Sequence, residues 1–182
     1  MASLKAWVKA GRPRTLPLAI TCVLIGAAIS LSPSDFSLDK LPDAKFYTVL
    51  GLTLLTVIYL QVLANFANDY GDFKKGTDGP DRSDRAMASG EISEKEMKRA
   101  LVATSIKAFI VGSATVFFAL DFDLTKSAIT LFFITLGCSS IYAAIRYTMG
   151  SGAYGYKGLG DVVVFIFFGY IGVLGVAYLL SG

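Results

Sequence analysis

The 182-residue sequence contains no histidine and only two cysteines. Histidine is the usual general base near neutral pH and the commonest protein ligand of transition metals, so its absence argues against both kinds of chemistry. Because no serine or cysteine triad is evident either, nucleophilic catalysis is disfavoured. Cys22 and Cys138 both lie inside apolar runs, and we interpret these thiols as small apolar fillers rather than as a disulfide or a metal pair.

Charged residues are also scarce, at 17% of the chain, whereas apolar residues make up 54%. The apolar residues come in five runs whose lengths approach the thickness of a bilayer. The runs are Leu16–Leu31, Phe46–Ala67, Ala100–Leu120, Ser127–Tyr147 and Val162–Leu180. We therefore predict an all-α fold, a multi-pass transmembrane helix bundle with five spans that forms a single membrane-embedded domain over residues 1–182. Small residues such as Gly26 and Gly112 would let the helices approach closely.

The net charge is only +3, but lysine and arginine are unevenly distributed. They gather in the N-terminal arm, in residues 68–99 and in residues 146–161, whereas the alternate connections hold few. The positive-inside rule then places the N-terminus and the 68–99 loop in the cytoplasm. We expect an integral protein of a bacterial inner membrane, surrounded by lipid and without a nucleic-acid partner.

The N-terminal arm has apolar residues at helical spacing, Leu4, Trp7 and Val8, with lysines between them. This pattern predicts a short helix on the membrane surface. Arg12 and Arg14 follow it. They are either topology anchors or the border of a site for an anionic headgroup or substrate.

The second apolar run ends in a polar stripe. Its members share one helix face within roughly a 100° arc, and they are Gln61, Asn65, Asn68, Asp69 and Asp72. Tyr70 points away from this arc. An aspartate at membrane depth costs about 2.5–3.5 kcal/mol, so a chain that keeps such groups usually has a ligand, ion or partner for them. The alternative is a helix cap with hydrogen bonds between helices.

Acids beside basic residues at a membrane face suit a diphosphate bridged by a divalent cation. Mg²⁺ prefers oxygen and usually takes one or two carboxylates together with phosphate oxygens and water. Asn68, Asp69 and Asp72 could face one such ion. The basic residues that could neutralise the remaining charge are Lys74, Lys75, Arg82 and Arg85. An allylic diphosphate would then ionise to a carbocation, which Phe66, Tyr70 or Tyr156 could shelter.

Residues 68–99 form the connection that carries these charges. Gly76, Gly79 and Pro80 interrupt regular helix there. Ser93, with Glu96 three residues later, has the spacing of a capping box and predicts the start of the next helix.

The later connection, residues 146–161, holds five glycines and three tyrosines. Glycine allows close approach of the backbone to a ligand, and tyrosine offers a hydroxyl and an apolar face. A flexible interfacial turn with aromatic anchors explains the pattern equally well.

Four stretches in order resemble the UbiA-type membrane prenyltransferases, most closely the branch that acts on 1,4-dihydroxy-2-naphthoate in menaquinone synthesis. They are Gly11–Pro17, Asn68–Asp72 with Gly76–Asp78, Arg85 followed by Gly90–Ser93, and Tyr154–Asp161. The wider family has an acid where this chain has Gly76, and the naphthoate branch moves that acid to Asp78, as here. Ala153 stands where the branch often has proline.

The resemblance implies a Mg²⁺-dependent transfer of a polyprenyl group from polyprenyl diphosphate to 1,4-dihydroxy-2-naphthoate, with loss of CO₂ and diphosphate. The implied metal ligands are Asn68, Asp69, Asp72 and Asp78; Lys75 and Arg85 would bind diphosphate oxygens. Tyr156, Lys157 and Asp161 would form the acceptor side, Asn65 is a further expected substrate-binding residue, and Asp69, Asp72 and Lys157 are the expected catalytic residues.

Such enzymes resemble nine-helix bundles with a second aspartate-rich motif. The five runs here correspond to the first part of that fold, so we expect the N-terminal portion of a longer protein that is incomplete for catalysis alone. The alternatives are a UbiA-type enzyme with another acceptor, such as 4-hydroxybenzoate or homogentisate, and a transporter or other ion-binding membrane protein. Phospholipid head-group transfer is less favoured, because its spaced acid motif is not found.

Overall fold

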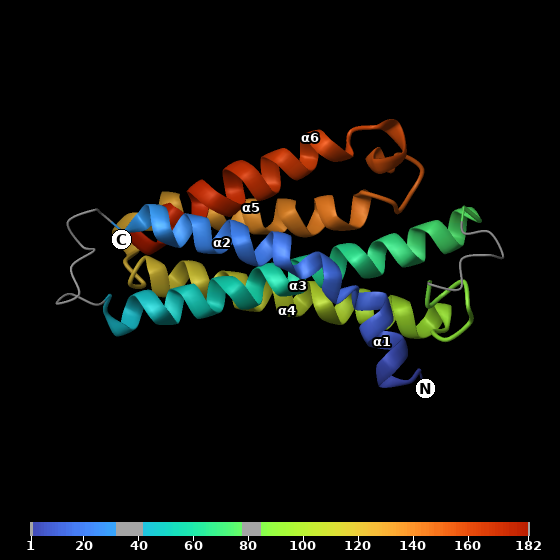
Figure 1. Ribbon diagram of the computed structural model, residues 1–182. Coiled ribbons are helices and arrows are strands. Elements are labelled where there is room, and N and C mark those ends of the chain that lie inside the picture. The colour runs from blue at the N-terminus through green and yellow to red at the C-terminus, as the bar shows by residue number, and fades with distance from the viewer. Residues whose placement is uncertain (1, 32–41, 78–84, 182) are drawn as a thin grey trace.

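The computed structural model describes residues 2–31, 42–77 and 85–181, and within these ranges the regular elements are all helical. Among the described residues, five helical segments are long and apolar enough to cross a membrane. They centre on α2 (Leu16–Ser30), α3 (Ala44–Lys75), α4 (Glu94–Ala119), α5 (Ser127–Arg146) and the C-terminal segment Gly160–Ser181. Figure 1 shows them running along one common axis. The predicted all-helical fold with five candidate spans is confirmed.

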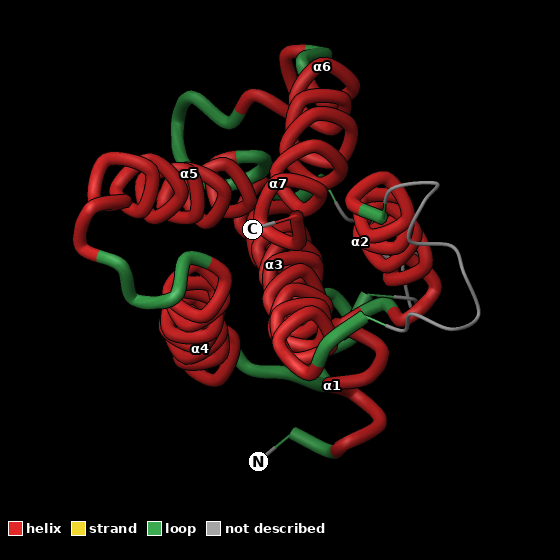
Figure 2. The backbone as a smooth tube through the Cα atoms, turned by 90° about the vertical axis from the view of Figure 1, so that its left-hand side faces the viewer, coloured by secondary structure: helices red, strands yellow, loops and turns green. Residues whose placement is uncertain are grey.

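Helix α3 is the centre of the bundle, and it contacts α1, α2, α4, α5 and α7 (Figure 2). Asp43 caps its start by accepting a hydrogen bond from the amide of Phe46, and Gly76 ends it in a left-handed conformation. With 32 residues, the helix is about 48 Å long, well beyond the roughly 30 Å of a hydrocarbon core. Residues 68–75, which the sequence assigned to the connection, thus continue the helix and hold its acids rigidly.

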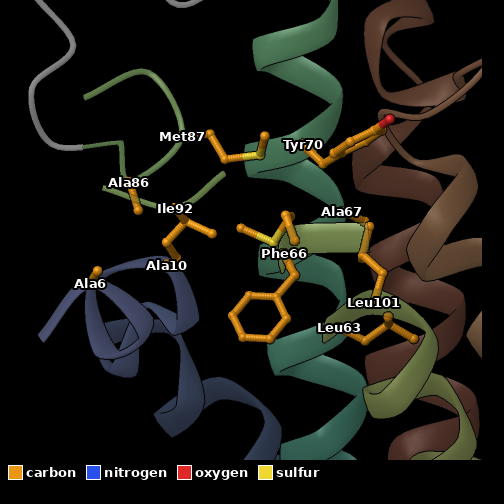
Figure 3. Packing of buried hydrophobic residues seen from close by; sticks show 11 residues of the cluster. Ala6, Ala10, Leu63, Phe66, Ala67, Tyr70, Ala86, Met87, Ile92 and Leu101 are labelled. Carbon is orange, nitrogen blue, oxygen red and sulfur yellow. The ribbon is translucent and has the colours of Figure 1, made fainter. Parts of the chain in front are cut away.

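Helix α1 (Leu4–Gly11) packs against α3 near the end that carries these acids, as Figure 1 shows. Its buried face joins a hydrophobic cluster built from three segments of the chain, shown in Figure 3. The cluster comprises Ala6, Ala10, Leu63, Phe66, Ala67, Tyr70, Ala86, Met87, Ile92, Met97 and Leu101. Trp7 adds an edge-to-face ring contact with Phe66 at 5.5 Å between centroids. The predicted N-terminal helix is therefore present, and it anchors the segment 85–92 to α3.

The capping box at the start of α4 is also present. Ser93 accepts a hydrogen bond from the amide of Glu96, while the Glu96 carboxylate accepts one from the amide of Ser93. Two amide donors that the first helical turn leaves without partners are thereby satisfied.

The last span is not a uniform α-helix. It consists of α6 (Gly160–Val164), the π-helix η5 (Phe165–Gly175) and α7 (Val176–Ser181). Helix α2 packs tightly against this segment, since a Cβ at Gly26 would lie 2.6 Å from the carbonyl oxygen of Val173. The apolar run predicted the span, but hydropathy alone does not distinguish α from π winding.

Candidate active site

A cavity of about 440 Å³ lies among α2, α3, α4, α5 and the last span. Its polar lining comes mainly from the end of the bundle near α1, where Arg12, Thr15, Asn65 and Asn68 are found. Further along, the wall is chiefly apolar, with residues such as Val57, Leu60, Phe133, Phe167 and Ile171. The cavity therefore suits a molecule with a polar head and an apolar tail.

Asp72 lies one helical turn beyond Asn68, and its carboxylate contacts side chains from two other segments of the chain. Its Oδ2 lies 3.2 Å from Nη2 of Arg85, and its Oδ1 accepts a 2.5 Å hydrogen bond from the hydroxyl of Tyr156. Lys75 places its ammonium 3.5 Å from the centroid of the Tyr156 ring, a cation–π contact. We call Asp72, Lys75, Arg85 and Tyr156 the Asp72 cluster. It brings together four of the residues that the sequence predicted.

The segment between α5 and α6 reaches this cluster because it is fastened to α3. Thr148 donates a hydrogen bond of 2.8 Å to the carbonyl of Ala67, and Gly71 leaves room for it. The hydroxyl of Tyr154 donates to the carbonyl of Ala143 at 2.7 Å, and burial raises the pKa of Tyr154 above its ordinary value. The short helix η4 (Tyr154–Lys157) then presents Tyr156 to Asp72.

The segment that supplies Arg85 is held by α1. Lys9 forms an ion pair of 2.5 Å with Glu91 and a hydrogen bond of 3.3 Å with Ser89. The hydrogen bond from Lys9, followed by one from Ser89, holds the pKa of Glu91 below its ordinary value of 4.5. Since Met87 and Ile92 are also buried against α1 and α3, the position of Arg85 follows from the docking of α1.

The turn between α1 and α2 is fixed by Asn65. The amide nitrogen of Asn65 donates to the carbonyl of Gly11 at 2.8 Å and to Oγ1 of Thr15 at 2.9 Å. Asn65 is 4% exposed. Its side-chain hydrogens are therefore used within the protein, on the two sides of Arg12, and its expected contact with substrate stays a prediction.

The other predicted residues are placed differently. Asn68 lines the cavity, whereas Asp69 is 1% exposed and lies inside the protein. Lys157 and Asp161 are exposed, and their side chains make no hydrogen bond or ion pair with a described residue. Asp78 falls outside the described residues, as does Arg82.

Three residues suggested from the sequence lie elsewhere. Lys74 pairs with Glu94 on α4 at 3.1 Å, away from Asp72. The hydroxyl of Tyr70 donates to the same Glu94, which confirms that Tyr70 faces away from the polar stripe. Phe66 is buried against Trp7 and does not line the cavity.

Tyr147 and Tyr154 are the aromatic residues near the polar lining that the sequence analysis did not single out individually. Both line the cavity, and their rings meet edge to face with centroids 5.4 Å apart. The density of tyrosine in residues 146–161 was the available signal, but it could not tell which rings would face inward.

Within the described residues, no three acidic, histidine or cysteine side chains come close enough to hold a metal ion. The donor chemistry nevertheless fits Mg²⁺, which needs only one or two protein carboxylates when phosphate oxygens and water complete its shell. Asn68 and Asp72 are four residues apart on one helix face, and both present oxygen atoms. The residues present therefore suit a magnesium ion that arrives with a diphosphate.

The sequence matches the model of the UbiA prenyltransferase family over residues 15–182. The chain belongs to the UbiA prenyltransferase family. Together with the five apolar spans among the described residues, this identifies an integral membrane protein of the prenyltransferase class. No solved structure matches the chain significantly.

Curated UbiA relatives are similar over nearly the whole chain. The 1,4-dihydroxy-2-naphthoate octaprenyltransferase of Escherichia coli (strain K12) is 43% identical over 177 residues, which cover 96% of this chain and 53% of the relative. The protein of the same name from Haemophilus influenzae is 42% identical, over 97% of this chain and 54% of the relative. The protein of the same name from Mycobacterium tuberculosis is 34% identical, over 98% of this chain and 55% of the relative. The chain thus spans about half the length of the curated relatives it matches.

Proposed function

We propose that the protein transfers a polyprenyl group from polyprenyl diphosphate to 1,4-dihydroxy-2-naphthoate, releasing CO₂ and diphosphate, in menaquinone biosynthesis. The observation that carries the proposal is the position of Asn68, which lines the apolar cavity one helical turn from the Asp72 cluster. An anionic head at Asp72 would leave its apolar tail along the cavity. The printed names of the relatives from Escherichia coli and Haemophilus influenzae also support this reaction.

The diphosphate would lie between the end of α3 and the segments that supply Arg85 and Tyr156. Arg85 already points its guanidinium at Asp72, and a guanidinium can grip phosphate oxygens in a bidentate manner. Lys75 stands on the same side, over the ring of Tyr156. Asn68, Asp69, Asp72 and Asp78 would hold Mg²⁺, which when bound supplies positive charge to the departing diphosphate.

The chemistry suits a chain without histidine. The bond between the prenyl carbon and the diphosphate oxygen breaks, with its electron pair on the oxygen, and the ring carbon that bears the carboxylate attacks the prenyl cation. Loss of CO₂ from that carbon returns an electron pair to the ring, so no general base is required. Tyr147 and Tyr154 offer ring faces to the cation, and the apolar walls of the cavity exclude water.

The proposed orientation places the N-terminus and the end of α3 in the cytoplasm. It is supported by the excess of lysine and arginine in the N-terminal arm and in residues 68–99. Labelling of single cysteines in intact cells tests this orientation. A cysteine at Ser89→Cys should react only after the cells are permeabilised, whereas a cysteine at Ser127→Cys should react in intact cells. The reverse pattern would overturn the orientation.

The function is tested with the full-length protein in lipid nanodiscs. We expect prenylated naphthalenediol from polyprenyl diphosphate, 1,4-dihydroxy-2-naphthoate and Mg²⁺, with activity lost in EDTA and restored by added Mg²⁺. Asp72→Asn should abolish transfer, whereas Asp121→Asn, which removes a carboxylate paired with Lys45 at 2.7 Å, should not.

Two results would contradict the proposal. Transfer that survives Asp72→Asn would reject the diphosphate site, and faster transfer to 4-hydroxybenzoate or homogentisate would reject the naphthoate acceptor. Ion flux through liposomes that is indifferent to polyprenyl diphosphate would instead favour a transporter.

A further inference from the structure

We propose that Arg12 and Gln61 recognise the aromatic acceptor, with Arg12 binding its carboxylate and Gln61 a ring hydroxyl. Asn65 is the positioning residue that holds Arg12. The inference rests on the proposed function for the identity of the acceptor, a flat ring that carries one carboxylate and two hydroxyls. It assigns that ligand to a part of the cavity separate from the Asp72 cluster.

Arg12 is the one charged side chain among the described residues that line the cavity. The surrounding wall is mostly apolar, and in such a medium a cation attracts an anion more strongly than it does in water. Arg85 and Lys75 belong to the Asp72 cluster and do not line the cavity. The position of Arg12 in the cavity wall therefore suits a second and smaller anionic group, such as a carboxylate, that enters the cavity.

The backbone of Arg12 indicates that its side chain has a role. Its φ of 47° and ψ of 68° lie in the left-handed region, which glycine adopts easily and arginine rarely. Such residues persist when the surrounding structure holds them, and they gather at functional sites. The chain keeps an arginine where the turn alone would favour glycine.

Asn65 is the residue that holds this turn. It binds the carbonyl of Gly11 and the hydroxyl of Thr15, on the two sides of Arg12, and the amide of Thr15 donates to the carbonyl of Arg12 at 2.9 Å. Asn65 is buried in the rigid helix α3. The place of Arg12 at the cavity is therefore set by α3 and not by α1 alone.

Gln61 lies one helical turn before Asn65 on the same face of α3, and it also lines the cavity. Its Oε1 is buried and accepts no hydrogen bond from any described residue. A buried acceptor without a donor is costly, and the hydroxyl of a ligand would supply the donor. Gln61 and Arg12 thus offer, along one wall, the two polar contacts that a hydroxylated aromatic acid requires.

Equilibrium binding to the full-length protein in nanodiscs tests the proposal with three ligands. These are 1,4-dihydroxy-2-naphthoate, 1,4-dihydroxynaphthalene, which lacks the carboxylate, and 2-naphthoate, which lacks the hydroxyls. Arg12→Gly should weaken binding of both carboxylates by about 10- to 100-fold and leave the diol unchanged. Gln61→Leu should weaken only the two hydroxylated ligands.

The variants are chosen so that misfolding cannot imitate the result. Arg12→Gly relaxes the left-handed backbone, and its thermal unfolding is compared with that of the wild type so that a loss of binding is separated from a loss of folding. Arg12→Lys, which keeps the charge, should retain part of the preference for carboxylates. Arg14→Ala is the matched control, since Arg14 is exposed in the same turn and does not line this cavity.

The role of Asn65 is tested by a double-mutant cycle. Asn65→Ala should raise the KM for the acceptor and leave that for polyprenyl diphosphate unchanged, and it should have little further effect when Arg12 is already glycine. Full additivity of the two substitutions would overturn the positioning role.

Three outcomes would each overturn the acceptor site. The wild-type protein could show no preference among the ligands, or the Arg12→Gly variant could bind the naphthoate as the wild type does. The third outcome is that Asn65→Ala raises the KM for polyprenyl diphosphate alone. If the ligands bind as expected but no prenyl group is transferred, the proposed function fails and the site for an aromatic carboxylate stands.

Discussion

The hydroxyl of Tyr156 donates a 2.5 Å hydrogen bond to Oδ1 of Asp72, across 84 residues of sequence. Arg85 occupies the other oxygen of the same carboxylate. Three segments of the chain therefore meet at one acid. The resemblance implied a place for Tyr156 on the acceptor side, and this contact instead joins it directly to the side where the diphosphate would bind.

Removing that hydroxyl tests the importance of the contact. Tyr156→Phe keeps the ring beneath Lys75 but removes the donor to Asp72, so we expect kcat/KM for polyprenyl diphosphate to fall by about tenfold. Steady-state kinetics measure this change in kcat/KM. Tyr142→Phe is the control, because Tyr142 is 65% exposed on α5. Equal kinetics in the two variants would show that the hydrogen bond has no part in turnover.

Gly71 is the point at which the 147–159 segment closes on α3. A Cβ there would lie 2.7 Å from the carbonyl oxygen of Thr148, so Gly71→Ala should destabilise the protein by about 1–3 kcal/mol. Gly51→Ala is a matched substitution in the same helix, where nothing lies within 4 Å. It should stabilise by up to about 1 kcal/mol through helix propensity. Thermal unfolding in detergent compares them, and equal melting temperatures would contradict the packing argument.

Because Lys9 and Glu91 form an ion pair, we expect the docking of α1 to weaken at acidic pH. The folded-state pKa of Glu91 is lowered from 4.5, so its contribution to stability is present above that value and is lost as the pH falls through the folded pKa. Protection of α1 from proteolysis should therefore decline below about pH 4.5. Glu91→Gln should remove this part of the decline. Identical pH profiles for the variant and the wild type would rule out the pair as its source.

The capping box gives a local test of stability. Ser93→Ala removes the acceptor for the amide of Glu96 and should cost about 1 kcal/mol, with faster hydrogen exchange confined to the first turn of α4. Ser139→Ala is the control, because Ser139 is exposed and its hydroxyl donates to the carbonyl of Thr135 in its own helix. A loss of stability as large in the control would mean that the effect does not come from the cap.

Features that depend on neighbouring residues could be predicted from the sequence. The spans follow from apolar runs, the start of α4 from Ser93 and Glu96, and the shared face of Asn68 and Asp72 from helical spacing. The winding of η5 could not be predicted, because an apolar run satisfies α and π geometry alike.

The candidate site was predictable in its residue types but not in its partners. Lys75, Arg85 and Tyr156 do gather at Asp72. Lys74 instead forms an ion pair with Glu94, and Asn65 donates a hydrogen bond to the α1–α2 connection. Helical spacing places residues on a face, but it does not say which other helix will cover that face.

The sequence by itself determined that the chain spans a membrane and that one helix carries a polar stripe into an acidic end, since both depend on periodicity and the cost of burying polar groups. Only the tertiary structure decided that Tyr156 meets Asp72 and that Asn65 holds the turn of Arg12. Those contacts join residues 50 to 84 positions apart. They depend on how closely helices pack at residues such as Gly71 and Gly26, which hydropathy does not encode.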